Sequence, residues 1–523
     1  MPADGPTVAA AAARQARVRG EHPLLICDGD HLSYAEAHRR SADLGRGLVA
    51  LGVGKGTHVG LLYPNGSDFV VGMLAAARIG AVVVPFTTFA TARELGEQLA
   101  DADVSILLSS RAYRAHDYVR RLQDALGVET FDPAERLFCP VAPQLRHVVF
   151  DQADIASCAS GVDATLLRAM EDDVDGSDPL AIVYTSGSTD APKGAVHTHA
   201  ALLTHQANLN AIRGLSADDR LFCNSPFFWI GGFAFALLAT LVAGSTLVCS
   251  NAVDAADTLD LLETQRPTIA NGFASAVAHL ARHDSFAHRD LSSLRRGNLY
   301  PIMPPESRPA DPELRHDMLG MTEAGGTLLI SGDESDQPED RRGSYGKPAP
   351  GFETRIADPG TGAVVAAGTV GELWIRGPHL MQRYYRRSRE ECFDPDGWFH
   401  TGDLVRADLD GYVYFIGRRT SMIKTSGANV SPAEVEKVIA KVTGGTVAHV
   451  VGLPDRDRGE VVAAVVVVDE GDGFDEAGLR ALLGRELSAY KVPRRFVALS
   501  AAKVPVLSSG KVDVRGLRKA FDA

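Results

Sequence analysis

The chain has 523 residues, too many for a single hydrophobic core, so we expect two or more domains. Apolar residues make up 45% of the sequence and charged residues 23%, which is the composition of an ordinary soluble globular protein. The net charge of −13 argues against nucleic acid or an anionic membrane as a partner.

The cysteines and the N-terminus indicate a reducing cytoplasm. The 6 cysteines are scattered and form no Cys-x-x-Cys or Cys/His cluster, so neither a disulfide framework nor a zinc site is expected. Residues 1–20 are Ala-rich and contain no apolar block, unlike a secretory signal.

Residues 229–248 carry no charge and are long enough to span a membrane. Their glycines instead favour a buried helix from about Phe233 that ends near Gly244, followed by a buried strand.

The N-terminal third alternates helix and strand patterns. Ser33 to Leu51 predicts an amphipathic helix, with Ser33 as its cap and Glu36 completing a capping box. Further elements are expected at 59–62 (strand), 69–79 (helix), 82–85 (strand) and 105–109 (strand). This order indicates parallel sheets with crossover helices. Residues 111–178 are weakly patterned, and we expect irregular surface there.

The alternation resumes between residues 220 and 273, and the texture then changes. From Gly346, short strands with Gly-rich turns predict a small β subdomain, with strands at 353–356, 371–376 and 411–416.

The last part of the chain has the size of a separate small domain. Ser431 and Pro432 open a capped helix, and residues 461–468 predict a central strand. The leucines at 479, 482, 483 and 487 share one helical face. The expected fold is therefore α/β, with a large N-terminal domain (1–418) that includes a β subdomain (346–418). A small, mobile α+β domain (419–523) follows after a short hinge.

A hydroxyl-rich loop follows the apolar run at 180–184 and reads Tyr-Thr-Ser-Gly-Ser-Thr-Asp-Ala-Pro-Lys-Gly over residues 184–194. Hydroxyls, backbone N–H groups and one lysine make a suitable cradle for phosphate oxygens. The residues of this cradle would be Thr185, Ser186, Gly187, Ser188, Thr189 and Lys193. It is not a Walker loop, because Pro192 precedes the lysine and Gly194 follows it. Taken alone, such a cluster is equally compatible with an ordinary polar loop.

The whole pattern at 184–194 resembles the phosphate loop of the AMP-forming adenylating enzymes, which include acyl-CoA synthetases, peptide-synthetase adenylation domains and luciferases. Four weaker motifs follow in the same order and spacing. They are Leu319-Gly320-Met321-Thr322-Glu323, Trp398-Phe399-His400-Thr401-Gly402-Asp403, Gly417-Arg418 and the segment 505–511. Together they extend the resemblance from about Leu25 to Arg518, and the pattern is most similar to acyl- or aryl-CoA synthetases.

The resemblance implies a role for each motif. Thr322 is expected to contact the AMP phosphate and Glu323 to hold magnesium, because a carboxylate beside a triphosphate requires a cation between them. Asp403 is expected to accept hydrogen bonds from both ribose hydroxyls, with Arg418 at the same ribose. Lys511 is expected to reach the α-phosphate, where a cation stabilises the charge that develops.

The reaction implied is attack of an acid on the α-phosphate of ATP, with loss of pyrophosphate and formation of a mixed anhydride with AMP. Catalysis would be positioning plus electrostatics. The catalytic residues would be Lys511, Lys193, Thr322 and Glu323. After rotation of the small domain, an acceptor channel would be lined by Ser426, Gly427 and Ala428. The cofactors implied are ATP, Mg²⁺ and CoA.

Several positions depart from the family pattern. Asp190 places a carboxylate in the phosphate loop, where the family usually has Gly. Trp229 stands where His is usual, residues 300–303 replace a Gly-Gly-Ala-Pro loop, Thr420 replaces a hinge Asp or Lys, and Leu319 replaces a Tyr. The nucleotide motifs are thus largely intact, while the acid side is remodelled. The residues expected to line the acid pocket are Trp229, Asn271, Phe273, Tyr300 and Gly320.

Three interpretations remain open from the sequence. The first is an acyl- or aryl-CoA synthetase that acts on a small acid. An aromatic acid would suit this pocket, because Trp229 can stack on its ring. The second keeps the adenylating chemistry but uses a carrier-protein thiol, an amine, or nitrite with an aromatic amine, as in a diazotase. The third is a non-catalytic nucleotide-binding relative. The sequence names neither the acid nor the acceptor nor the oligomeric state.

Overall fold

The computed structural model describes residues 5–132, 135–185, 192–418, 423–430, 432–468, 474–505 and 512–522. The chain divides into two compact units. Unit 1 comprises Met1–Thr88, Gly96–Tyr184 and Gly194–Gly417. Unit 2 comprises Arg418–Ala523 together with two short segments from earlier in the chain, Phe89–Leu95 and Thr185–Lys193.

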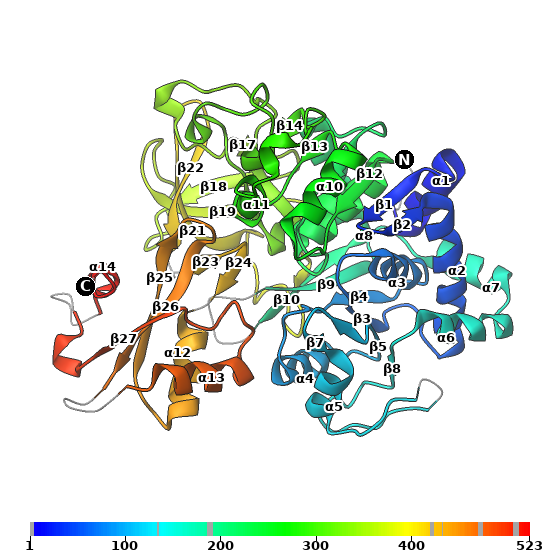
Figure 1. Ribbon diagram of the computed structural model, residues 1–523. Coiled ribbons are helices and arrows are strands. Elements are labelled where there is room, and N and C mark those ends of the chain that lie inside the picture. The colour runs from blue at the N-terminus through cyan, green and yellow to red at the C-terminus, as the bar shows by residue number, and fades with distance from the viewer. Residues whose placement is uncertain are drawn as a thin grey trace. The chain divides into compact units, whose positions relative to one another are not determined.

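A 7-stranded sheet forms one layer of unit 1 (Figure 1). Its order is β20 (Arg383–Tyr384), β10 (Lys193–Thr198), β9 (Pro179–Thr185), β4 (Val82–Pro85), β3 (His58–Leu62), β5 (Ile106–Ser109) and β8 (His147–Val149). The pairings of β3 with β4 and β5, of β4 with β9, and of β5 with β8 are all parallel. Helices α3 (Ser67–Arg78) and α4 (Ala92–Asp101) connect successive parallel strands. The predicted parallel sheet with crossover helices is confirmed.

A 6-stranded sheet forms the second layer. Its order is β14 (Arg296–Gly297), β13 (Ile269–Ala270), β11 (Arg220–Phe222), β12 (Thr246–Cys249), β1 (Pro23–Cys27) and β2 (Asp30–Ser33). Only the β1–β2 hairpin is antiparallel. Helix α10 (Ala255–Gln265) connects β12 to β13, and α11 (Ala274–Ala281) follows β13. Helix α8 (His199–Arg213) leads from β10 of the 7-stranded sheet to β11.

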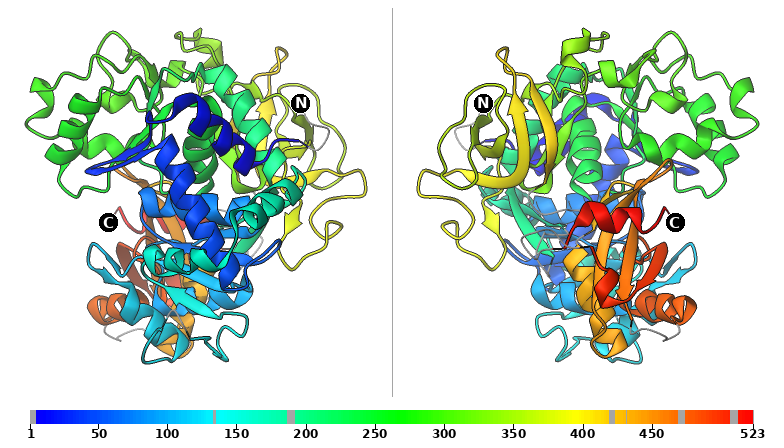
Figure 2. Two further views of the ribbon diagram at one scale, coloured as in Figure 1. Left: turned by 90° about the vertical axis from the view of Figure 1, so that its right-hand side faces the viewer. Right: turned by 90° about the vertical axis from the view of Figure 1, so that its left-hand side faces the viewer.

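The core of unit 1 lies around α3. Of its 12 residues, all except Asp68 are buried, because the helix packs against β3 and β4 of one sheet and β2 of the other. A helix that is apolar on every side is expected between layers. Helix α2 (Tyr34–Ala50) begins after Ser33, whose Oγ accepts the Glu36 N–H at 3.1 Å, as predicted. Figure 2 shows α1 (Val8–Arg19) and α2 in blue, packed together.

Residues 111–178 contain regular structure, so the prediction of irregular surface was wrong. They form β6 (Ala112–Tyr113), β7 (His116–Asp117), α5 (Tyr118–Leu126), β8, α6 (Gln152–Ala156) and α7 (Ala164–Asp173). The helices α5 and α7 begin at aspartate caps, since Asp117 accepts the Arg120 N–H and Asp163 accepts the Thr165 N–H. Each helix is short and buries at most three residues, so the sequence shows too little of a helical period to identify it.

The uncharged stretch 229–248 is a buried helix followed by β12, as predicted. Its first part, η2 (Gly231–Leu238), is wound as a π-helix, and α9 (Ala239–Ala243) continues it. Gly244 ends the helix with a positive φ of 78°, a conformation that suits glycine. No helix among the described residues is long and apolar enough to cross a membrane.

Antiparallel strands build the remainder of unit 1. One 4-stranded sheet has the order β18 (Glu353–Ala357), β19 (Gly371–Arg376), β21 (Phe399–Ala407) and β22 (Val413–Arg418), shown in yellow in Figures 1 and 2. This sheet is the predicted small β subdomain. A 3-stranded sheet contains β15 (Leu319–Met321), β16 (Gly326–Ile330) and β17 (Lys347–Pro348).

Unit 2 is an α+β fold. Its sheet contains β23 (Ile423–Thr425), β24 (Ala428–Val430), β25 (Ala448–Asp455), β26 (Gly459–Val467) and β27 (Arg495–Leu499). Its helices are α12 (Pro432–Thr443), α13 (Glu476–Glu486) and α14 (Val514–Lys519). β26 lies between β25 and β27, so the predicted central strand is confirmed. Leu479, Leu483 and Leu487 are buried, but Leu482 is 40% exposed and does not share their face.

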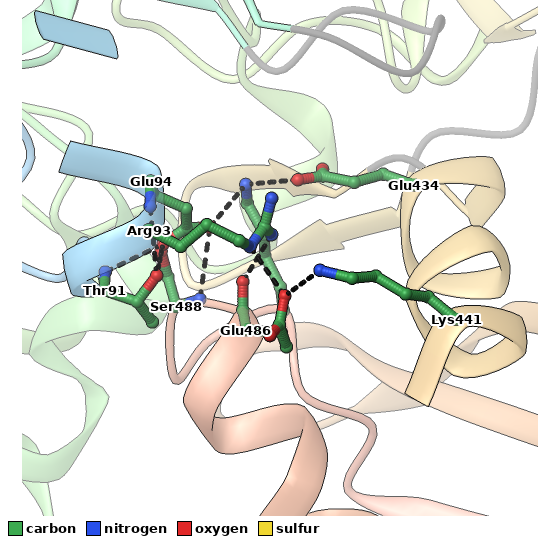
Figure 3. Close-up of polar contacts among 8 residues, drawn as sticks. Thr91, Arg93, Glu94, Glu434, Lys441, Glu486 and Ser488 are labelled. Atoms are coloured by element: carbon green, nitrogen blue, oxygen red, sulfur yellow. Dashed lines mark hydrogen bonds and ion pairs between the residues drawn. The ribbon is translucent and has the colours of Figure 1, made fainter. Parts of the chain in front are cut away.

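A buried charge cluster ties the segment Phe89–Leu95 into unit 2 (Figure 3). The ammonium of Lys491 lies 2.8 Å from a carboxylate oxygen of Glu434 and 3.2 Å from one of Glu94. Ser488 donates its hydroxyl to Glu94 at 2.5 Å, and Arg93 pairs with Glu486 at 2.8 Å. We call Glu94, Glu434, Ser488 and Lys491 the Lys491 cluster.

Candidate active site

A tight hairpin presents Thr322 and Glu323. They begin the short helix η6 (Thr322–Ala324) between β15 and β16, and Gly325 and Gly326 turn the chain with φ of 68° and 132°. His197 on β10 supports the hairpin, with its Nε2 2.7 Å from the carbonyl oxygen of Thr322. Burial lowers the pKa of His197 to about 4, so the ring is neutral and Nε2–H donates to that oxygen.

Glu323 is anchored at both its backbone and its side chain. The Met381 N–H donates to the Glu323 carbonyl oxygen at 2.8 Å, and the Tyr384 hydroxyl donates to Glu323 Oε1 at 2.6 Å. Tyr384 lies on β20, opposite Ala195 of β10. Its ring contacts Phe399, the first residue of the strand that carries Asp403, at a centroid distance of 6.4 Å.

Asp403 lies in a rigid turn at a β-bulge. The pairing of β19 with β21 shifts between Glu372 and Trp374, opposite residues 401–403. Gly402 has a φ of 72°, and its N–H donates to Glu372 Oε1 at 2.9 Å. Thr401 Oγ1 accepts the Asp403 N–H at 3.0 Å and donates to the Leu373 carbonyl at 2.7 Å. These bonds aim the Asp403 side chain, which is 1% exposed.

Two residues that the sequence analysis missed hold the turn before Trp229. The Asn65 amide donates to the Ser225 carbonyl at 3.1 Å and accepts the Phe227 N–H at 2.8 Å, so it brackets Pro226. Gly232 packs so closely that a Cβ atom there would lie 2.1 Å from the Pro226 carbonyl oxygen. Trp229 itself is half-buried and meets Phe228 edge to face. The Gly-Gly pair after Trp229 was the one local signal of this close packing.

A buried arginine joins the π-helix to Asn271. Arg213 donates to the Asn210 amide oxygen at 2.9 Å, to the Phe235 carbonyl at 2.8 Å and to the Asn271 amide oxygen at 3.4 Å. Its guanidinium lies 4.0 Å from the centre of the Phe235 ring. Burial lowers the pKa of Arg213 to about 9.

The other predicted pocket residues differ in their exposure. Asn271 is buried, and its amide nitrogen donates to Asn298 at 3.3 Å. Phe273 and Gly320 are exposed, and Tyr300 is partly buried. Tyr300 begins a single 3₁₀ turn, η4 (Tyr300–Ile302), and burial raises its pKa to about 12, so it remains a neutral hydroxyl. Whether the segment 300–303 meets adenine stays a prediction.

The predicted acceptor-channel loop is a tight hairpin in unit 2. Ser426 and Gly427 have φ of 48° and 82° between β23 and β24, the pattern of a type I′ turn. The backbone N–H of Ser426 donates to the Arg458 carbonyl at 2.8 Å, and Arg458 Nη1 donates to Ser426 Oγ at 3.2 Å. The turn is therefore rigid, and its proposed role in an acceptor channel stays a prediction.

Several predicted site residues lie outside the described residues. They are Ser186, Gly187, Ser188, Thr189, Asp190, Thr420 and Lys511. Thr185 is the last residue of β9 and Lys193 the first of β10, so the phosphate loop connects two neighbouring strands of the 7-stranded sheet. Arg418 is the last residue of β22.

The candidate site fits a magnesium ion only if ATP supplies most of the ligands. Among the described residues, no group of three or more His, Cys, Asp or Glu side chains could hold a metal ion. Magnesium is usually bound through one or two carboxylates plus the phosphates of the substrate. One carboxylate, that of Glu323, is therefore a sufficient protein contribution.

Comparisons with known proteins cover nearly the whole chain. The profile of AMP-binding enzymes matches residues 12–385, and that of the AMP-binding enzyme C-terminal domain matches residues 434–511. Feruloyl-CoA synthase of an Amycolatopsis species is 32% identical, covering 97% of this chain and 98% of that protein. 4-coumarate-CoA ligase 5 of Oryza sativa subsp. japonica is 30% identical, covering 94% and 89%. The structure of amide bond synthetase McbA from Marinactinospora thermotolerans aligns with a TM-score of 0.78 at 26% identity, covering 98% and 99%.

Proposed function

Because the chain belongs to the family of AMP-binding enzymes, we propose that it is an ATP-dependent, AMP-forming ligase that joins a small aromatic acid to CoA. The strongest support is that both family profiles match in order, while Glu323 and Asp403 occupy turns that other residues hold rigidly. Relatives named for ferulate and coumarate support an aromatic acid. The half-buried Trp229 supplies a surface on which such a ring can stack.

The site residues that the structure describes have distinct tasks in this proposal. The buried Asp403 carboxylate accepts hydrogen bonds from the ribose hydroxyls, because a carboxylate is acceptor-only and can engage two donors. The hairpin holds Thr322 beside the AMP phosphate and Glu323 beside the triphosphate. Magnesium, held by Glu323 and ATP, would neutralise phosphate charge. No residue serves as a nucleophile, so the protein acts by orienting the acid and ATP and by excluding water.

The proposal extends to residues whose roles rest on the sequence motifs, some of which lie outside the described part of the chain. Lys193, at the start of β10, and Lys511 would supply the two cations at the phosphates. The hydroxyls and N–H groups of residues 185–189 would form the phosphate cradle. Arg418 would contact the ribose, and residues 426–428 would line the acceptor channel.

Two further parts of the proposal concern organisation and location. Residues 419–523 would act as a small mobile domain, supported by the division of the chain between Gly417 and Arg418. The protein would work in the cytoplasm, supported by six cysteines that are all unpaired.

A second candidate function keeps the adenylate but uses an amine as the acceptor. The likeness to an amide bond synthetase over 98% of this chain favours it. Two further alternatives use the same adenylating chemistry. In one the acceptor is a carrier-protein thiol, and in the other nitrite is the acid and an aromatic amine the acceptor.

The test is a screen of pyrophosphate release over aromatic acids, aliphatic acids and nitrite, with ATP and Mg²⁺. Each acid is tested alone, with CoA and with amines, and the products are identified by mass spectrometry. We expect AMP, pyrophosphate and an aryl-CoA thioester with at least one aromatic acid. Amide or diazo products without any thioester would favour the second candidate. No ATP cleavage under any condition would exclude both.

A further inference from the structure

Glu323 receives a hydrogen bond from a residue that no motif names. The Tyr384 hydroxyl lies 2.6 Å from Glu323 Oε1. An ionised carboxylate has no proton to donate, so the tyrosine must be the donor. Hydrogen bonds to charged acceptors are among the strongest in proteins. This contact fixes which oxygen of Glu323 is engaged and in which direction the carboxylate faces.

Tyr384 is itself held too firmly to follow a moving carboxylate. The backbone on both sides of it is hydrogen-bonded to β10. The Gln382 N–H donates to the Val196 carbonyl, and the Tyr385 N–H donates to the Gly194 carbonyl. The Tyr384 ring is 8% exposed and packs on Phe399. The hydroxyl is therefore a fixed point toward which Glu323 turns.

The adjacent tyrosine makes the same kind of bond in a different place. Tyr385 directly follows β20, and its hydroxyl donates to Asp103 Oδ2 at 2.7 Å. Asp103 belongs to none of the nucleotide motifs. The chain thus contains two neighbouring Tyr–carboxylate pairs, of which only one involves the candidate active site.

We propose that Tyr384 is a positioning residue that holds the Glu323 carboxylate in the orientation needed to bind magnesium-complexed ATP. This inference rests on the proposed role of Glu323. Without the hydroxyl, the carboxylate loses one hydrogen bond and rotates among its rotamers. ATP binding that depends on the cation then weakens, whereas contacts to the base and ribose remain.

The experiment measures ATP binding by isothermal titration calorimetry in the presence of Mg²⁺ and in the presence of EDTA. The variants are Tyr384→Phe, Tyr385→Phe as the matched control, Glu323→Gln, and the double variant of Glu323→Gln with Tyr384→Phe. We expect Tyr384→Phe to raise the Kd for ATP with Mg²⁺ roughly tenfold, the scale of one charge-assisted hydrogen bond. With EDTA its Kd should match that of the unchanged protein, and Tyr385→Phe should have no effect in either condition.

The double variant separates positioning from a general packing effect. If Tyr384 acts through Glu323, removing its hydroxyl in the Glu323→Gln background should cause less than about a twofold further change. A tenfold loss that persists in that background, or that is equal with EDTA, would overturn the inference. Equal behaviour of Tyr384→Phe and Tyr385→Phe would overturn it too.

Thermal unfolding of each variant checks that the fold is intact. Should Tyr384→Phe not fold, Tyr384→Met provides the same test, because it also removes the hydroxyl that donates to Glu323 while it keeps an apolar side chain at the buried position. It should then show the same Mg²⁺-dependent loss. Pyrophosphate release by the unchanged protein is recorded in parallel. Its absence with every acid would refute the proposed function, whereas the binding comparison alone decides the role of Tyr384.

Discussion

The proposed nucleotide side and the proposed acid side of unit 1 are held together in different ways. The Asp403 turn is shaped by Thr401 and Gly402, its immediate neighbours in sequence, and by Glu372 on the next strand. The turn before Trp229 depends instead on Asn65, which is 160 residues from Ser225. A turn that is held by residues next to it in sequence has a recognisable motif. A turn that is held by hydrogen bonds from a distant residue does not. This difference explains why the sequence did not identify Asn65 as a residue that holds the turn before Trp229.

The largest effect is expected from the nucleotide side. Asp403→Ala should lower AMP formation at least about a hundredfold, because two donors from the ribose would lose a buried charged acceptor. Asp410→Ala is the control, since that carboxylate is 64% exposed and pairs with Arg341 at the surface. Steady-state kinetics with the acid identified by the screen make the comparison. Equal activities of the two variants would place ribose recognition elsewhere.

On the proposed acid side, we expect the most harmful substitution to be at a glycine rather than at a charged residue. Gly232→Ala would put a Cβ atom 2.1 Å from the Pro226 carbonyl oxygen, so the π-helix must move. We expect a loss of about 3 kcal/mol of unfolding free energy, the upper range for overpacking. We also expect a raised KM for the acid, while the KM for ATP changes little.

The matched control for this steric argument is the neighbouring glycine. A Cβ atom at Gly231 would meet nothing closer than Ser225 Oγ at 3.7 Å, so Gly231→Ala should leave the unfolding free energy within about 0.5 kcal/mol. Denaturant unfolding measures both. If the two alanines are equally harmful, close packing on Pro226 is not the cause.

Unit 2 offers a second case of contacts between residues that are distant in sequence. Glu94 accepts a hydrogen bond from Ser488, 394 residues away, and pairs with the buried Lys491. Glu94→Gln should destabilise the protein by about 2 kcal/mol, because Lys491 would keep only one carboxylate partner. Glu476→Gln, which breaks a surface pair with Arg480, should cost less than about 0.5 kcal/mol. Thermal unfolding curves distinguish the two.

The Glu94 contribution should also depend on pH. Burial alone would raise the pKa of Glu94, but Lys491, Ser488 and the Thr91 N–H outweigh it and lower the pKa below 4.5, its ordinary value. A lowered carboxyl pKa stabilises the fold above the unfolded-state pKa, and this stabilisation is lost as the pH falls through the folded-state value. The stability difference between the unchanged protein and Glu94→Gln should therefore be full near neutral pH and shrink below pH 4.5. A constant difference down to acid denaturation would contradict this.

The smallest effect is expected at Trp229. Trp229→Ala should raise the KM for a small aromatic acid several-fold, about 1 kcal/mol, by removing one stacking surface. It should also admit bulkier acids, since the indole no longer fills the space beside Phe228. Competition between acids of increasing size is the measurement. An unchanged order of preference would show that Trp229 lies outside the pocket.

Local patterns predicted most elements of the fold. The Ser33 cap, the Gly244 stop and the apolar run of β26 each act within a few residues, so their outcome follows from sequence alone. The short helices of residues 111–178 were not predicted, because each buries at most three residues, as α5 does with Tyr118, Leu122 and Leu126. In the site, Glu323 and Asp403 were found by motif, whereas Tyr384, Asn65 and Arg213 were not.

The sequence by itself determined the family, the order of the elements and the chemistry-bearing motifs, because these depend on residue type and short spacing. Only the tertiary structure decided what holds each motif in place. Tyr384 meets Glu323 from 61 residues away, and Arg213 meets Asn271 from 58. Pairing of β20 with β10 brings Tyr384 to the side of the sheet strand next to the hairpin of Glu323, and no local pattern encodes that pairing. The physical reason is that hydrogen bonds and close packing act between atoms that the fold brings together, whatever their separation along the chain.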